Sequence, residues 1–224
     1  MSAPTTFGLR IRALEVSDLP FARETLRAFL PGGFFADLGD AFLSTYLRTY
    51  ATSPSGCALI AESAGRPVGF LVGSVDRDSY RHHVLHAERW KLLVKGIIGL
   101  ALRPRLAVQF VRTRLRRYLQ GMQRRAPGSP ATSVDTQVGV LAHIAVVPEA
   151  RGTGVGKALM MNFLSVCAAH GTPRVRLYVG PSNTGAQSFY RANGWAEVAR
   201  QADADGVPWI VMEVVLPASV PLDA

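Results

Sequence analysis

The spacing of apolar residues predicts strands and helices in a β-α-α-β-β order over the first 75 residues. Apolar and polar side chains alternate over the segments that we predict as strands, which are 9–14, 57–62 and 67–75. Between the first two strands, apolar residues recur at helical spacing over about 17–29 and 37–50. Ser17 and Asp18 are expected to cap the first of these helices.

The second half of the chain continues the alternation of strands and helices. The strands predicted here are 138–147, 175–179, 195–198 and 209–216. An apolar-periodic helix follows the first of them, and a second helix precedes the two closing strands. This order of elements favours an α/β (α+β) fold, in one domain that spans residues 1–224.

Residues 76–135 separate the third predicted strand from the fourth. A structureless loop of about 60 residues is uncommon in a compact domain. Helical spacing instead predicts one helix over Val84–Leu102 and a second over Leu106–Met122, with Pro104 at the break between them. We therefore expect an inserted helical hairpin.

The insertion carries most of the positive charge. The chain has a net charge of +9, and 13 of its 25 Lys and Arg residues, but only 2 of its 16 acidic residues, lie between Arg77 and Arg125. Several uses stay open: a solvated basic face, a lid over an acceptor site, a phosphate-bearing substrate, a homodimer contact or an anionic membrane surface. Nucleic acid is less favoured, because few aromatic residues accompany the arginines. The longest apolar run, Gly96–Leu102, is too short to span a bilayer.

Other residues bear on the cellular location of the protein and on metal binding. No apolar secretory signal follows the N-terminal methionine, and Cys57 and Cys167 lie in apolar contexts typical of reduced core thiols. We therefore expect a cytoplasmic protein. His82, His83 and His86 lack further clustered ligands, so we expect no metal site.

A glycine-rich segment, Arg151–Lys157, lies between the fourth predicted strand and the next helix. The first turn of a helix has free N–H groups at the positive end of the helix dipole, and glycine lets a phosphate approach the backbone closely. The segment lacks the first glycine and the final Ser or Thr of a P-loop, and Lys157 replaces the third glycine of a dinucleotide-binding motif. It predicts a different anion site, with a ligand-free turn as the alternative.

Two motifs resemble those of the GCN5-related N-acetyltransferase (GNAT) superfamily. The first, [R/Q]-x-x-G-x-[G/A], is carried by Arg151, Gly154 and Gly156. The second, N-x-x-A-x-x-[FL]-Y-x-x-x-G-[FW], is matched by Asn183, Ala186, Phe189, Tyr190, Gly194 and Trp195. Taken singly, an N-cap role for Asn183 and a core role for Tyr190 stay open. The two motifs in register favour membership of the superfamily.

The resemblance implies the GNAT fold, with a mixed sheet of about seven strands and flanking helices. The family usually joins strands 3 and 4 by a short turn, so the predicted hairpin between them is an atypical insertion. It also implies acetyl-CoA as co-substrate, with no metal. Amides of the glycine loop would hold the pyrophosphate, and the end of the fourth strand would pair with the pantetheine arm. The residues that the resemblance assigns to cofactor binding are Ile144, Ala145, Val146, Arg151, Gly152, Thr153, Gly154, Val155, Gly156, Lys157 and Asn183.

The resemblance makes Tyr190 the proton donor to the leaving thiolate, and a phenol with a pKa of about 10 carries that proton at neutral pH. The base that deprotonates the amine stays open. His143 is the one titratable residue of the fourth strand, but strict alternation places it on the face of Leu141 and Ala145 unless a β-bulge reverses the faces. A histidine of the insertion is the alternative base.

We therefore predict an N-acetyltransferase that acts on a primary amine of a small molecule by direct attack in a ternary complex. The insertion resembles one found in acetyltransferases associated with surface polysaccharides, and arginine pairs well with phosphate, so amino sugars or sugar nucleotides are candidate acceptors. Protein or peptide acetylation is an alternative, although Tyr178 stands where the branch that acetylates protein N-termini carries glutamate. The third alternative is a non-catalytic acyl-CoA-binding module.

Overall fold

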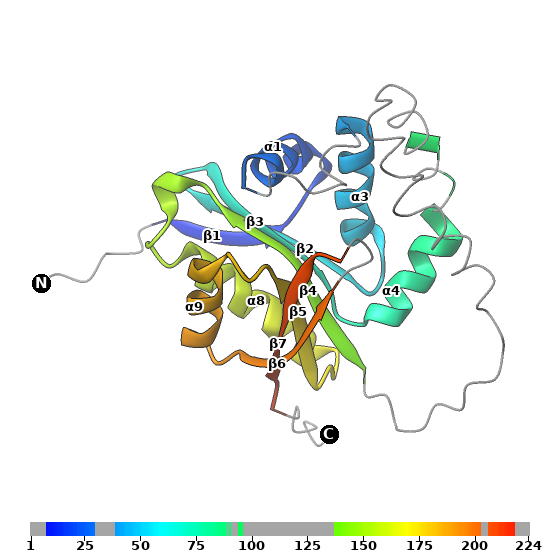
Figure 1. Ribbon diagram of the computed structural model, residues 1–224. Helices are drawn as coiled ribbons and strands as arrows, with labels where there is room; N and C mark the ends of the chain where they lie inside the picture. Colours follow the sequence, from blue (N-terminus) through cyan, green and yellow to red (C-terminus); the bar gives the residue numbers. More distant parts are fainter. Residues whose placement is uncertain are drawn as a thin grey trace, which may run out of the picture.

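The computed structural model describes residues 8–29, 39–88, 90, 94–95, 137–202 and 206–217. They form a seven-stranded sheet with helices on both faces (Figure 1). The strand order is β1-β2-β3-β4-β5-β7-β6, and all neighbours are antiparallel except β4 and β5, which are parallel. The predicted α+β fold with a mixed sheet is confirmed.

All the predicted strands are present. They are β1 (Leu9–Ala13), β2 (Gly56–Ser63), β3 (Arg66–Ser74), β4 (Val138–Val146), β5 (Arg174–Val179), β6 (Ala196–Ala202) and β7 (Pro208–Val215). The largest difference from the prediction is at β6, which continues past Val198 to Ala202.

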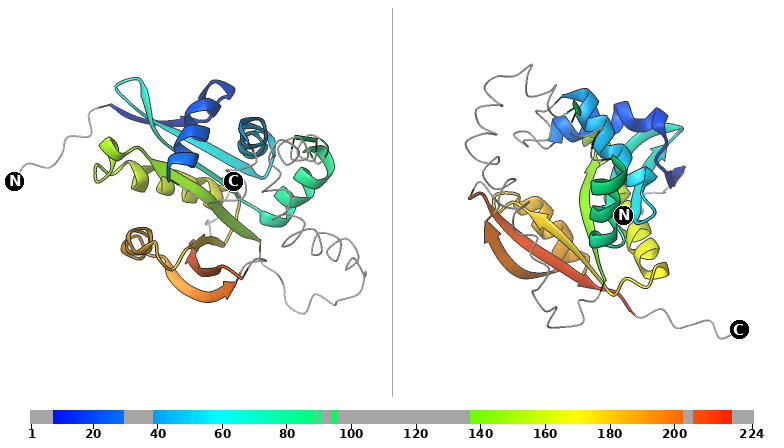
Figure 2. Two further views of the ribbon diagram at one scale, coloured as in Figure 1. Left: turned by 45° about the horizontal axis from the view of Figure 1, so that its top comes forward. Right: turned by 90° about the vertical axis from the view of Figure 1, so that its right-hand side faces the viewer.

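Two pairs of helices cover the two faces of the sheet. They are α1 (Leu19–Phe29) and α3 (Asp40–Thr52) on one face, and α8 (Val155–Ala169) and α9 (Thr184–Ala192) on the other. Figures 1 and 2 show this arrangement. Each pair packs on the sheet through its own cluster of buried apolar side chains. We call the two sides the α8 face and the α1/α3 face.

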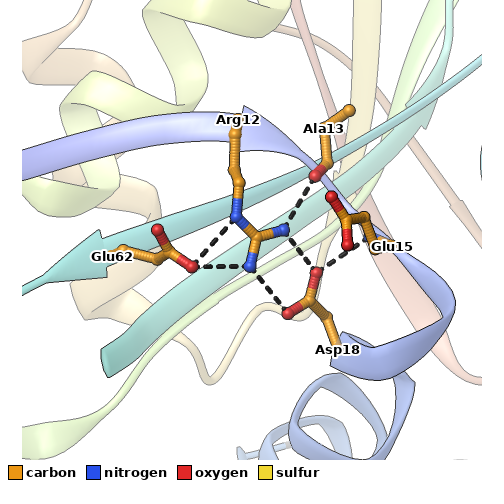
Figure 3. A network of polar contacts seen from close by, with 5 residues as sticks. All are labelled: Arg12, Ala13, Glu15, Asp18 and Glu62. Carbon is orange, nitrogen blue, oxygen red and sulfur yellow. Dashed lines mark hydrogen bonds and ion pairs between the residues drawn. The ribbon is translucent and has the colours of Figure 1, made fainter. Parts of the chain in front are cut away.

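An ion-pair network fixes the start of α1 to the edge of the sheet (Figure 3). Arg12 on β1 donates two bonds to Asp18, of 2.6 and 2.9 Å, and also bonds Glu62 on β2. Asp18 ends the short helix η1 (Val16–Asp18), which leads into α1, and it accepts the Glu15 amide at 2.8 Å. Bonding to Arg12 lowers the pKa of Asp18. Asp18 therefore binds β1 instead of acting only as the predicted helix cap.

The insertion begins with α4 (Arg77–His83), which continues as the π-helical turn η2 (Val84–Glu88). The predicted start at Val84 is seven residues too late, because the Asp76 carboxylate caps the helix by accepting two backbone amides, at 3.0 and 3.3 Å. Further along the insertion, Lys95 Nζ donates to Thr45 Oγ1 on α3 at 2.6 Å. The predicted second helix of the hairpin lies outside the described residues.

The two cysteines are buried in the core as free thiols, and burial raises the pKa of Cys57 to about 11 and that of Cys167 to about 12. Both are inert at neutral pH for that reason. Within the part of the chain that the structure describes, no helix has the length and apolar character needed to cross a lipid bilayer.

Candidate functional site

Only part of the β4 edge that faces β5 is paired with that strand. The two strands pair over Val138–Val140 and Arg174–Arg176, and the remaining six residues of β4 have no pairing with β5. The two strands lie together at one end and separate toward the other (Figure 2). The strand then ends before Pro148, as predicted, and the short helix η4 (Pro148–Ala150) leads into the glycine loop.

The register on the other edge of β4 determines which backbone groups face β5. The Val147 amide donates to the Val68 carbonyl on β3 at 3.0 Å. Because hydrogen-bonded pairs alternate along an antiparallel ladder, Ala145 also bonds β3, whereas Ile144 and Val146 turn their backbone groups toward β5. Three strand residues were assigned to the cofactor. The backbone groups of Ala145 are hydrogen-bonded to β3, whereas those of Ile144 and Val146 face the gap toward β5.

The glycine loop forms the N-terminus of α8. Gly152 and Gly154 have φ angles of 75° and 92°, and Gly154 is the N-cap residue. The first helical bond runs from the Ala158 amide to the Gly154 carbonyl at 2.9 Å. The amides of Val155, Gly156 and Lys157 precede that bond, and no backbone acceptor for them occurs among the described residues. Three N–H groups are therefore presented together at the positive end of the helix.

The other side chains of the loop hold its shape. The Thr153 hydroxyl donates to the Ala150 carbonyl at 2.7 Å. Arg151 Nε donates to the Val146 carbonyl at 3.1 Å, and its guanidinium lies 4.2 Å from the centre of the Phe29 ring. Arg151 thus ties the loop to the end of β4, and its bond to the carbonyl leaves the amide of Val146 as the free backbone group there.

The motif of α9 is placed beside this loop. A Cβ at Gly156 would meet the side chains of Phe189 and Val146 at 3.7 Å, so loop, strand end and α9 converge. Asn183 caps α9, because its Oδ1 accepts the Ala186 amide at 3.1 Å. The N-cap role of Asn183, which the sequence left open, is therefore confirmed. The Nδ2 group of this exposed residue has no partner within the described ranges and stays free to donate.

Tyr190 lies in the core cluster of the α8 face and is 7% exposed. Its ring packs against Trp195 at 5.7 Å between centroids, and the Trp195 indole in turn donates to the Met160 sulfur at 3.2 Å. Burial raises the pKa of Tyr190 to about 12. Gly194 has a φ of 86° just after the helix, a conformation that suits glycine at the end of α9.

A β-bulge decides the direction of His143. The register of β4 against β3 shifts between Val72 and Gly73, which pair with His143 and Leu141, so Ala142 is the extra residue. Strict alternation, which puts His143 on the face of Leu141, is therefore wrong here. The His143 side chain lies on the α1/α3 face, where Nε2 is 3.1 Å from the Tyr46 hydroxyl.

His143 ends a chain of hydroxyl groups. The Tyr46 hydroxyl is 3.0 Å from that of Tyr50, one helical turn later on α3. Desolvation lowers the pKa of His143 to about 4, so the imidazole is neutral at neutral pH, and burial raises the pKa of Tyr46 and Tyr50. With all three groups neutral, Tyr50 can donate to Tyr46 and Tyr46 to the imidazole, which gives a continuous path for a proton.

Tyr50 also lines a cavity of about 300 Å³ on the α1/α3 face. Helix α4, the turn η2 and strands β3, β4 and β5 supply the rest of the wall. The lining residues are Tyr50, Ser74, Arg77, Tyr80, Arg81, Val84, Leu85, Val140, Ala142 and Tyr178. The sequence motifs do not identify this cavity. The spacing of four between Tyr46 and Tyr50 signals a shared helix face, but no local pattern connects that face to β4 or α4.

The histidines of the insertion form no comparable site. The rings of His82 and His86 stack at 3.9 Å, and His86 Nδ1 lies 2.8 Å from the His82 carbonyl oxygen. In the described part of the chain, no group of three or more His, Cys, Asp or Glu residues is placed to hold a metal ion. None of these histidines lines the cavity beside α4.

Residues 114–195 match the sequence model of the acetyltransferase (GNAT) family. A mycothiol acetyltransferase of Beutenbergia cavernae is 38% identical to this chain over 74 residues, which are 33% of this chain and 25% of the relative. The chain thus spans about a quarter of the length of the curated relatives that it matches.

Solved structures share the fold over nearly the whole chain. A GCN5-related N-acetyltransferase from Kribbella flavida has a TM-score of 0.58 at 17% identity and covers 93% of this chain and 98% of its own. A phosphinothricin acetyltransferase from Sinorhizobium meliloti, solved in complex with AcCoA, has a TM-score of 0.57 at 16% identity and covers 94% and 89%. At these identities the likeness concerns the fold.

Proposed function

This chain belongs to the GNAT superfamily, and we propose that it is an N-acetyltransferase that moves the acetyl group of acetyl-CoA to a primary amine of a small molecule. Attack is direct, within a ternary complex of enzyme, thioester and amine. We also propose that residues 1–224 act as one domain, in which residues 76–135 are an inserted basic segment.

The observation that carries this proposal is the continuity between two sets of free backbone amides. Val155, Gly156 and Lys157 present three N–H groups at the start of α8, where the helix dipole favours a diphosphate. Gly156 is in turn close to Val146, at the end of the β4 edge that β5 leaves unpaired. One extended molecule with a diphosphate and an amide-containing arm matches both sets, and coenzyme A has that form.

The two faces of the sheet supply the two halves of the reaction. Tyr190 belongs to the core of the α8 face, and His143 with its tyrosines belongs to the α1/α3 face. The separation of β4 from β5 is the place where groups on opposite faces approach each other. A thioester lying along β4 would then have a proton donor on one side and an amine on the other, which favours direct attack over a covalent enzyme intermediate.

The transfer requires a hydrogen-bond donor to the acetyl oxygen and a proton donor to the leaving thiolate. The Val146 amide, whose carbonyl is held by Arg151, donates to the oxygen of the acetyl group as negative charge develops there. Tyr190, with a pKa of about 12, is fully protonated at neutral pH and gives its proton to the departing thiolate. In the described structure its hydroxyl has no other hydrogen-bond partner that would compete for this proton.

His143 could receive the amine's proton only through Tyr46 and Tyr50, because its Nε2 contacts Tyr46 and Tyr50 is the member that lines the cavity. Its pKa of about 4 makes it a weak acceptor, since each pKa unit of mismatch costs about 1.4 kcal/mol. We therefore propose that His143 orients the tyrosine hydroxyls by accepting from Tyr46 and does not keep the proton, and that water takes the proton directly from the amine.

A small acceptor agrees best with the site. A cavity of about 300 Å³ is at the lower limit for small-molecule sites. The name of the curated relatives, mycothiol acetyltransferase, also supports a small acceptor. Amino sugars and sugar nucleotides remain our candidates for its class. The arginines of the insertion that motivate a diphosphate, Arg112, Arg116 and Arg117, lie outside the described residues.

The first test is calorimetric titration of the whole chain with CoA and acetyl-CoA, followed by product detection with a panel of amines and a short peptide. We expect micromolar binding of both thiol and thioester, and acetylation of small amines at a higher kcat/KM than the peptide. Binding without turnover of any amine would favour the acyl-CoA-binding module. Absence of heat at millimolar ligand would remove the proposal altogether.

A further inference from the structure

The cavity on the α1/α3 face has the features of a binding site for an anionic amine. It lies against Val140 and Ala142, where β4 loses its pairing with β5, so it is at the start of the gap along which the proposed thioester would lie. Tyr50 connects it to the His143 relay. No motif that identifies the coenzyme site touches it.

The charged residues that line the cavity are all basic. The lining is mainly apolar, and its charged residues are two arginines, Arg77 and Arg81, one turn apart on α4, with no acidic residue among them. Arg77 Nε bonds the neighbouring Asp78 at 3.3 Å. Arg81, which is exposed, has no ion-pair partner among the described residues. The carboxylates of Asp76 and Asp78 both offset the charge of Arg77, and Arg81 leaves the rim of the cavity with a positive charge.

The floor of the cavity is neutral and aromatic. The Tyr50 and Tyr80 rings stack at 4.6 Å between centroids, and the Tyr80 hydroxyl lies 2.6 Å from Thr49 Oγ1. Val84 and Leu85 from the turn η2 add apolar surface on the α4 side. An aromatic floor accepts both the apolar body of a ligand and an amine lying on a ring face. A ligand carboxylate or phosphate would be poorly placed there and well placed at the arginines.

We infer that this cavity binds the acceptor and selects a monoamine that also carries a carboxylate or a phosphate, with Arg77 and Arg81 holding the anion and Tyr50 near the amine. Guanidinium pairs with either oxyanion in two-bond geometry, so the two share one recognition chemistry. Polyamines are disfavoured, because their second cation would lie beside the arginines. This inference rests on the proposed function, of which it specifies the substrate class.

Matched pairs of amines separate the anion from the rest of the ligand. Tyrosine and tyramine differ by the carboxylate, glucosamine 6-phosphate and glucosamine differ by the phosphate, and spermidine supplies the polycation. Binding of each to the CoA-saturated chain is measured by calorimetry, and initial rates are measured separately with acetyl-CoA. We expect one anionic member to bind at least about tenfold more tightly than its neutral partner, which also tells carboxylate from phosphate.

The variants are the double substitution Arg77→Gln and Arg81→Gln, and Arg81→Glu alone. The first should abolish the preference for the anion and leave the Kd of CoA unchanged, and the second should reverse the preference. Arg48→Gln is the matched control, because Arg48 is an exposed arginine on α3 that does not line the cavity. Thermal unfolding of each variant, together with its CoA affinity, shows that the protein is folded.

Failure of this inference is distinct from failure of the proposed function. Arginine-dependent binding of anionic amines without turnover would support the cavity as their site and contradict the transferase. Turnover of neutral or cationic amines that the double variant does not alter would support the transferase and overturn the inference. Equal binding of the two members in both pairs, or no binding of any amine at millimolar concentration, would also overturn it.

Discussion

The two faces of the sheet bring different kinds of chemical group to the same strand. On the α8 face, the groups available to a ligand are mainly backbone amides, fixed by the glycine loop and by the edge of β4. On the α1/α3 face, they are side chains: the tyrosine hydroxyls of α3 and the guanidinium groups of α4. Tyr190 is the exception, since it adds a side-chain proton donor to the α8 face.

This difference suggests how a single fold can keep one ligand and change another. Backbone amides depend on the path of the main chain, so many substitutions leave them in place. The acceptor side depends on which side chains α3 and α4 carry, and a few substitutions there would change its charge. The comparison therefore predicts that changes on the α8 face affect the coenzyme or the chemical step, while changes on the α1/α3 face affect the acceptor or the stability.

The largest effect is expected from Tyr190→Phe. The ring stays packed against Trp195, so the core of the α8 face is retained, but the thiolate loses its proton donor. We expect kcat to fall by about 10²-fold or more, with the Kd of CoA unchanged. Steady-state rates and calorimetry measure the two quantities. A near-normal kcat would remove Tyr190 from the mechanism and leave the α8 face with backbone groups only.

His143 gives the α1/α3 face a distinct pH dependence. Its pKa is about 4 in the folded protein and about 6.5 in an unfolded chain, so the unfolded state binds the proton first as the pH falls. The free energy of unfolding should therefore decrease from pH 6.5 down to pH 4, by about 3 kcal/mol from this group. Chemical denaturation at half-unit pH intervals measures the slope.

The control for this pH dependence is His143→Gln. A glutamine carbonyl can still accept from the Tyr46 hydroxyl but does not titrate. The slope between pH 6.5 and 4 should flatten in this variant, while CoA affinity at pH 7 stays the same. If the wild-type chain and the variant have parallel stability curves over this range, His143 is not held neutral by burial.

Gly154→Ala tests whether the loop conformation matters for the coenzyme. Alanine at a φ of 92° costs about 1 kcal/mol of stability, although space for the methyl group is open. We expect the Kd of CoA to rise about tenfold, equivalent to 1.4 kcal/mol, because the three amides at the start of α8 lose their common direction. Gly171→Ala is the matched control at the other end of the same helix, with a φ of 71° and equally open space.

Both glycine variants should lose similar stability, and only Gly154→Ala should bind CoA more weakly. Differential scanning fluorimetry and calorimetry provide the two measurements. Equal CoA affinity in both variants would show that the loop is a turn that does not bind CoA. It would also remove the main distinction between the two faces.

The loop and the helix ends of the proposed coenzyme side could be predicted from the sequence because they are local. Arg151–Lys157 and Asn183–Trp195 are short motifs, and their Gly154, Asn183 and Gly194 determine helix ends within the same motif. Strand spacing could not show which of Ile144, Ala145 and Val146 has free backbone groups. That depends on the register with β3, in which these residues pair with Leu71, Phe70 and Gly69.

The acceptor side could not be predicted, because its contacts join distant segments. His143 and Tyr46 are 97 residues apart, and Tyr80 and Thr49 are 31 apart. The bulge at Ala142 inverts the alternation between Leu141 and His143 from which the direction of His143 was predicted. Apolar spacing also missed the start of α4, because the Asp76 cap precedes the first apolar repeat.

The smallest effect is expected from Asp18→Asn, at the edge of the α1/α3 face. Asp18 accepts two bonds from Arg12 and has a lowered pKa, so its contribution is present above the unfolded pKa of about 3.9 and is lost as the pH falls through the folded pKa. We expect the variant to be less stable by about 1 kcal/mol at pH 7 and to converge with the wild type below pH 3.9. Glu24→Gln, at a carboxylate that is 74% exposed on α1, should change nothing. If Asp18→Asn weakens CoA binding instead of stability, the two faces are coupled, and their separate roles must be abandoned.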